Sequence, residues 1–148
     1  LNQVVEGVDG VRTGVHICRG NWSRKEEVLL TGDYAPLLDF FESIKVDQMV
    51  LEYATPRAGD IAVVAKALAS REIGLGVVNP RTSTAESVAA IVEQVEAALA
   101  YFRPTQVFLN PDCGFGCFAN RCVNDELTAV AKITNIAAAS RILREKHG

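Results

Sequence analysis

Residues 73–109 read IGLGVVNPRTSTAESVAAIVEQVEAALAYFRPTQVFL, and this stretch decides the fold. It opens with an apolar run, Ile73 to Val78, which is typical of a strand buried on both faces of a parallel sheet. Ser83-Thr84-Ala85-Glu86 matches a capping box and predicts the start of a helix. Gln106 to Leu109 is a second short apolar run and predicts the next strand. The helix between them carries its apolar residues on one face: Val88, Ile91, Val92, Val95, Leu99 and Phe102.

The same alternation of strand and helix continues on both sides of this stretch. Val11 to Ile17 and Gln48 to Tyr53 are predicted strands. Helical spacing follows each of them, in Leu37, Leu38, Phe41 and Ile44 behind Pro36 and in Ile61, Val64 and Leu68. The last helix is predicted to begin at Asn124 or Asp125, with four inward residues: Leu127, Val130, Ile133 and Ile136.

Four strands, each followed by a helix, call for a parallel sheet with right-handed crossovers. We therefore predict an α/β fold in which residues 1–148 form half of a (βα)8 TIM barrel, since a complete barrel typically needs about 250 residues. The alternative is a flavodoxin-like open sheet, which would require a fifth strand. Residues 20–35 are long for a connection between a strand and its helix, and such excursions are often functional.

The composition of the 148 residues excludes several classes of protein. A hydrophobic fraction of 49% is too high for disorder, and a net charge of −3 argues against nucleic-acid binding. No apolar run approaches the roughly 20 residues that a membrane-spanning helix needs. The start, Leu1-Asn2-Gln3, has no secretory signal and no Met, so we expect a processed or truncated chain. Four cysteines in a chain of this size fit reduced thiols in the cytoplasm better than a disulfide framework.

Side chains that bind soft metals stand at the ends of the predicted strands. His16 and Cys18 are two residues apart, which places both on one face of a strand. Glu52 ends the second strand, Asn79 ends the third, and Cys113 follows the fourth, at the face where barrel enzymes build active sites. Zinc accepts His, Cys and Glu as ligands, whereas magnesium and calcium prefer oxygen. The joint arrangement predicts a zinc site.

Taken singly, each candidate ligand also has a structural explanation. The histidine can be a hydrogen-bonded structural residue, either thiol can be a small buried hydrophobe, and Glu52 can form an ion pair with Arg57. Cys113, Cys117 and Cys122, with the distant fourth cysteine, would form an iron–sulfur site instead. Their spacing matches none of the common cluster motifs. We therefore expect Cys117 and Cys122 to be bystanders.

Three motifs carry a family resemblance: HICRGN at 16–21, LEYATPRAG at 51–59 and NPDCGFG at 110–116. In this order they resemble the C-terminal catalytic domain of cobalamin-independent methionine synthase, a zinc-containing barrel that alkylates thiols. The chain is similar to the second four βα units of that barrel, so the resemblance implies its C-terminal half. Residues 19–57 are more similar to the short archaeal-type or coenzyme M transferase-like relatives. Four residues match the family's zinc ligands: His16, Cys18, Glu52 and Cys113.

The resemblance implies zinc-dependent transfer of a methyl or alkyl group to a thiol. The synthase-like form moves methyl from a 5-methyltetrahydrofolate-type donor to homocysteine, and Glu52 is expected to leave the zinc when the thiol enters. The alternatives are a coenzyme M-type transferase with an epoxide or corrinoid donor, and a non-catalytic zinc-bearing half-barrel that completes a partner. The expected partner is an N-terminal barrel half or a second copy. The residues expected to contact the substrate are Asn21, Arg57, Asn79 and Asp112.

Overall fold

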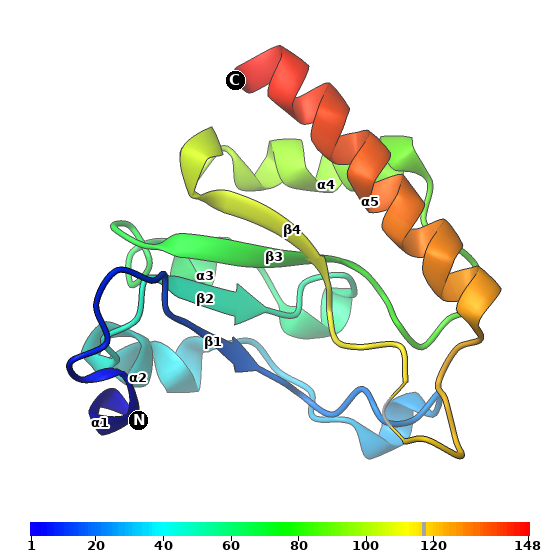
Figure 1. The fold of residues 1–148 in the computed structure, drawn as a ribbon, viewed down its shortest axis with the longest axis horizontal. Helices are drawn as coiled ribbons and strands as arrows, with labels where there is room; N and C mark the ends of the chain where they lie inside the picture. Colours follow the sequence, from blue (N-terminus) through cyan, green and yellow to red (C-terminus); the bar gives the residue numbers. More distant parts are fainter. Residues whose placement is uncertain (117) are drawn as a thin grey trace.

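A computed structural model describes residues 1–116 and 118–148, which form one parallel sheet with helices packed against it (Figure 1). The strands are β1 (Gly14–Ile17), β2 (Gln48–Leu51), β3 (Glu72–Val78) and β4 (Val107–Pro111). The helices are α1 (Asn2–Val5), α2 (Leu38–Ser43), α3 (Ala62–Ala65), α4 (Val88–Ala98) and α5 (Glu126–His147). Short 3-10 turns are η1 (Glu26–Val28), η2 (Ala35–Leu37), η3 (Pro56–Ala58) and η4 (Pro104–Gln106).

The strands pair in chain order, β1-β2-β3-β4, and every pair is parallel. This confirms the predicted order of strands and helices. A doubly wound sheet reverses its strand order at one point, whereas a barrel keeps it sequential, so the observed order favours the barrel. The first strand begins at Gly14 rather than Val11, because the Thr13 N–H donates to the Asp47 carboxylate at 2.6 Å instead of pairing with a strand.

The start of α4 differs from the prediction. Ser87 is the N-cap residue, and its hydroxyl accepts a hydrogen bond from the Ala90 N–H at 3.2 Å. Glu86, the last residue of the predicted capping box, turns elsewhere: it accepts from the Asn79 N–H at 2.9 Å and forms an ion pair with Lys132 at 2.8 Å. The Ser83 to Glu86 segment is therefore a loop, because its glutamate is taken by tertiary partners. The predicted apolar face of the helix is correct, with Ile91, Val95 and Phe102 buried.

Helix α5 begins as predicted but buries a different face. Asp125 caps it by accepting from the Thr128 N–H at 2.7 Å. Of the four residues predicted to point inward, Ile136 is buried, while Leu127, Val130 and Ile133 are exposed. α5 packs beside α4 (Figure 1) and reaches past the last strand of the sheet. The face of α5 that the described residues cover carries Lys132, Ile136, Ala139 and Leu143 instead.

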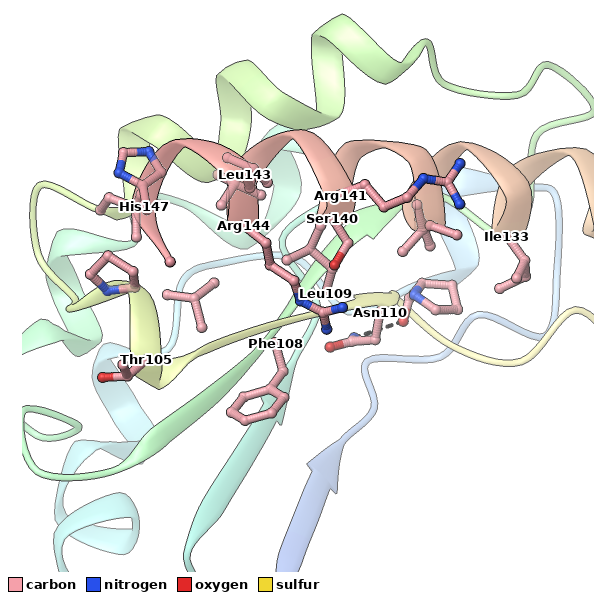
Figure 2. Close-up of a pocket in the computed structure, with 18 residues that line it drawn as sticks. Thr105, Phe108, Leu109, Asn110, Ile133, Ser140, Arg141, Leu143, Arg144 and His147 are labelled. Atoms are coloured by element: carbon pink, nitrogen blue, oxygen red, sulfur yellow. Dashed lines mark hydrogen bonds between the residues drawn. The ribbon is translucent and has the colours of Figure 1, made fainter.

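That exposed side of α5 and the free edge of β4 border a groove of about 810 Å³ (Figure 2). Ile133, Ser140 and Arg144 of α5 face the strand across it, and Phe108 points to the opposite face of β4. Phe108 is 37% exposed, a high value for an aromatic residue in the middle of a strand. No helix in the described part of the chain is both long enough and apolar enough to cross a membrane.

Candidate metal centre

His16, Cys18 and Cys113 meet at the C-terminal edge of the sheet. His16 lies in β1, Cys18 follows that strand directly, and Cys113 comes two residues after β4. One ligand atom from each lies within 4.8 Å of the others, and the two Sγ atoms are 3.9 Å apart. Because β1 and β4 are the opposite edges of the sheet, this approach requires strong curvature of the sheet. The structure therefore brings together three of the four predicted ligands.

The surroundings of these three residues fit a zinc ion. The His16 Nδ1 atom lies 3.1 Å from the Val50 carbonyl oxygen, which can only accept, so Nδ1 donates and Nε2 stays available to a metal. The Gly20 N–H donates to Cys18 Sγ at 3.4 Å and so helps to fix the position of that sulfur. His16 and Cys18 are exposed, and Cys113 is half-buried, so an ion and a substrate can reach the group. Two thiolates and an imidazole are donors that zinc prefers.

Glu52 lies beside this group without joining it. Its carboxylate is 1% exposed, and Oε1 accepts from the Arg19 N–H at 2.8 Å and from the Asn21 amide at 2.6 Å. Oε2 forms an ion pair with Arg57 at 3.2 Å, as expected if Glu52 has a structural role. The Arg19 N–H that donates to this carboxylate belongs to the residue directly after Cys18. A direct Glu52 ligand therefore remains a prediction.

Asp112 joins strands that are not neighbours. Its Oδ1 atom accepts from the Tyr53 and Ala54 N–H groups, both at 2.9 Å. These hydrogen bonds join the segment after β4 to the segment after β2, although β3 lies between the two strands. Gly76 makes this reach possible, because a Cβ atom there would lie 2.0 Å from Oδ1. Burial raises the pKa of the Asp112 carboxyl to about 7. The residue thus supports the shape of the site, and its contact with substrate stays a prediction.

The other expected substrate residues are also engaged within the protein. Asn79 is buried, and its Oδ1 atom accepts from the Arg81 N–H at 3.0 Å. Asn21 lies between Glu52 and Arg81, with the Arg81 Nε–H donating to Asn21 Oδ1 at 2.8 Å. Arg57 donates to Glu52 and to the Leu30 carbonyl at 3.0 Å. Substrate contacts by these residues remain predictions.

Three buried polar residues in or behind the site were not predicted from the sequence. Arg81 is 4% exposed and follows β3 in the sequence Asn-Pro-Arg, so its place after a strand end was the available signal. Tyr34 is 1% exposed; its hydroxyl accepts from the Glu52 N–H at 2.9 Å, and burial raises its pKa to about 12. Lys132 is fully buried in α5 and donates to the Thr84 carbonyl at 2.6 Å. A single lysine on a helix carries no sequence signal for such a role.

Cys122 lies outside the metal group among the described residues. Its side chain is exposed, and Sγ is 3.7 Å from the Phe118 carbonyl oxygen. Cys117, the other expected bystander, lies outside the described residues, so the prediction for it stands untested. Cys18, Cys113 and Cys122 form no disulfide bond with one another.

Residues 23–139 match the model of the family described as cobalamin-independent synthase, catalytic domain. The chain belongs to this family. Methionine synthases of Pyrococcus abyssi and Thermococcus kodakarensis are 31% and 32% identical to it over 99% of its length. It covers 37% and 38% of those two proteins, so this member of the family spans well under half the length of its relatives.

Two solved structures contain a similar fold within a longer chain. A B12-independent methionine synthase from Shewanella sp. W3-18-1 superposes with a TM-score of 0.80 at 17% identity, over 99% of this chain and 42% of that one. A putative B12-independent methionine synthase from Listeria monocytogenes gives a TM-score of 0.62 at 21% identity, over 99% and 39%. The predicted fold class is thereby confirmed: the chain is an α/β unit of four parallel strands that corresponds to part of a TIM-barrel domain.

Proposed function

We propose that this chain supplies the metal-binding half of a methyltransferase site that methylates the thiol of homocysteine. The observation that carries the proposal is the group formed by His16, Cys18 and Cys113, with ligand atoms within 4.8 Å of one another. Membership of the cobalamin-independent synthase family and relatives named methionine synthase support it. Reduced cysteines used for metal binding suit a reducing compartment, so we place the protein in the cytoplasm.

The proposed chemistry is the alkylation of a thiolate. Zinc, when bound by His16, Cys18 and Cys113, supplies Lewis acidity that lowers the pKa of a substrate thiol. The sulfur then forms a bond to the methyl carbon while the bond from that carbon to the donor breaks, and the electron pair leaves with the donor. With a 5-methyltetrahydrofolate-type donor, the departing nitrogen takes up a proton. Glu52 is the residue proposed to complete the set that would hold the zinc, and its carboxylate would be the one to give way to a substrate thiol.

The proposed partner of the chain is an N-terminal barrel half. The edge of β4, the exposed face of α5 around Ile133 and the groove between them are where a further strand and helix would continue the barrel (Figure 2). An open strand edge next to an apolar face favours pairing with another chain. The relatives extend well beyond the matched segment, which supports a heterologous half over a second copy. An isolated, monodisperse and active monomer of 16.0 kDa would contradict this pairing.

The proposed metal site is tested by metal analysis of the purified chain and of variants. Wild type is expected to hold about one zinc per chain, and Cys113→Ser is expected to lose it under mild chelation. Cys122→Ser is the matched control, because its thiol lies outside the group. X-ray absorption of the zinc before and after addition of homocysteine separates a catalytic site, which gains a sulfur ligand, from a closed structural site. A chain that binds no zinc, or a Cys113→Ser variant with full zinc occupancy, would overturn the proposal.

A further inference from the structure

Three buried side chains from three different loops form a chain of hydrogen bonds beside the metal group. Arg81, after β3, donates from Nε to Asn21 Oδ1 at 2.8 Å, and Asn21, after β1, donates from Nδ2 to Glu52 Oε1 at 2.6 Å. Glu52 itself follows β2. The three residues are 4%, 1% and 1% exposed, so water does not compete for these contacts. A buried polar network of this kind holds its members in one arrangement.

The direction of these hydrogen bonds is determined by chemistry. A guanidinium can only donate, so the atom of Asn21 that faces Arg81 must be the amide oxygen. The amide nitrogen of Asn21 is consequently turned toward Glu52, where it can only donate. The Glu52 carboxylate can only accept, so both partners select the same orientation of the amide, and removal of the guanidinium would leave Asn21 held at one end only. Arg81 thereby holds Asn21 in the position from which it donates to Glu52.

The two oxygens of Glu52 are not used equally. Among the described residues, Oε1 accepts two hydrogen bonds, from the Arg19 N–H and from Asn21, whereas Oε2 accepts one, from Arg57. A carboxylate oxygen has two lone pairs, so Oε1 is saturated and Oε2 keeps one acceptor site. If Glu52 serves as a ligand, the arrangement presents Oε2 and keeps Oε1 in place.

We propose that Arg81 and Asn21 are positioning residues that lock Oε1 of Glu52 so that Oε2 is directed to the metal. This inference rests on the proposed function, and it gives Asn21 a role that needs no contact with substrate. Hydrogen bonds to a ligating side chain orient it, and their removal typically weakens metal binding about 10- to 100-fold.

The loop that carries Arg81 is held firmly enough for such a role. Asn124 donates from Nδ2 to the Thr82 carbonyl at 2.8 Å and also to the Pro80 carbonyl. Lys132 donates to the Thr84 carbonyl at 2.6 Å. These contacts come from α5 and the segment before it, so the position of the guanidinium is set by the packed scaffold rather than by a free loop.

The test is a double-mutant cycle read as zinc affinity, measured on the full chain by competition with a chelating dye. Arg81→Gln and Asn21→Ala are each expected to weaken zinc binding about 10- to 100-fold. Because the two residues act in series on one oxygen, the double variant is expected to be no weaker than the weaker single variant. Arg71→Gln is the matched control, since Arg71 donates to the Glu42 carbonyl at 3.3 Å and lies before β3, at the opposite end of the sheet.

Cobalt-substituted protein gives a second readout that is independent of activity. Its visible absorption reports the number and geometry of ligands, and Arg81→Gln is expected to change that spectrum while Arg71→Gln leaves it unchanged. Wild-type affinity and spectrum in Arg81→Gln, or fully additive losses in the cycle, would overturn the positioning role. Cys18→Ser separates the two proposals, because retained zinc there would overturn the metal site itself. If Arg81→Gln lacks the near-ultraviolet circular dichroism of folded protein, Arg81→Lys replaces it, with a loss of affinity again expected.

Discussion

Gly76→Ala should be among the most damaging small substitutions in this chain. The added Cβ would lie 2.0 Å from Asp112 Oδ1 and 2.9 Å from both the Leu51 carbonyl oxygen and the Tyr53 nitrogen. Two of these three neighbours are backbone atoms, which cannot rotate away. Overpacking costs about 1–3 kcal/mol, and displacement of the carboxylate breaks two buried hydrogen bonds at about 1–1.5 kcal/mol each. We therefore expect the free energy of unfolding to fall by roughly 3–6 kcal/mol.

Two other glycines of the same sheet provide graded controls. At Gly74 the nearest atoms, at 2.8–3.1 Å, belong to the side chains of Asn110 and Val50, which can shift, so Gly74→Ala should cost about 1–3 kcal/mol. At Gly14 the nearest atom is 3.5 Å away, and Gly14→Ala should lie within about 0.5 kcal/mol of wild type or gain stability. Urea unfolding, analysed by linear extrapolation, measures all three. Equal stabilities of the Gly76→Ala and Gly14→Ala variants would refute the close approach of Asp112 to β3.

Three further predictions concern single side chains. Burial raises the pKa of Tyr34 from 10.0 to about 12, so the hydroxyl of the unfolded chain ionises at a lower pH than that of the folded chain. The free energy of unfolding should therefore fall as the pH rises from 10 to 12. Tyr34→Phe should flatten that pH dependence in urea titrations and lower the free energy of unfolding by about 1 kcal/mol at neutral pH. Cys18→Ser should abolish zinc binding in a chelator titration, and retention of wild-type affinity would contradict the ligand set. Lys132→Met should lower the free energy of unfolding by about 2 kcal/mol. This is less than the loss expected from breaking a fully buried ion pair, because the Glu86 side chain is 23% exposed. Urea unfolding identical to that of wild type would argue against the ion pair.

Much of the fold followed from local patterns in the sequence. Continuous apolar runs such as Ile73 to Val78 indicated buried parallel strands, and their alternation with helical stripes indicated the order of the sheet. The cap of α5 at Asp125 was also readable, since a capping hydrogen bond joins residues three apart. His16 and Cys18 were readable as a pair because a spacing of two places both side chains on one face of a strand. In each case the interacting groups are neighbours in the chain.

The rest was decided by contacts between residues far apart in the chain. Residue types mark Cys113 and His16 as possible ligands, but only the curvature of the sheet brings the ends of β1 and β4 within reach of one ion. Glu86 had a local role available as part of a capping box, and a buried lysine from α5 took it instead. Glu52 likewise accepts from Arg19 and Asn21, a segment more than 30 residues away in the chain, and only its ion pair with the nearby Arg57 could be expected from the sequence. The physical reason is that a sequence specifies which groups must be satisfied, while the packed structure selects the partners that satisfy them.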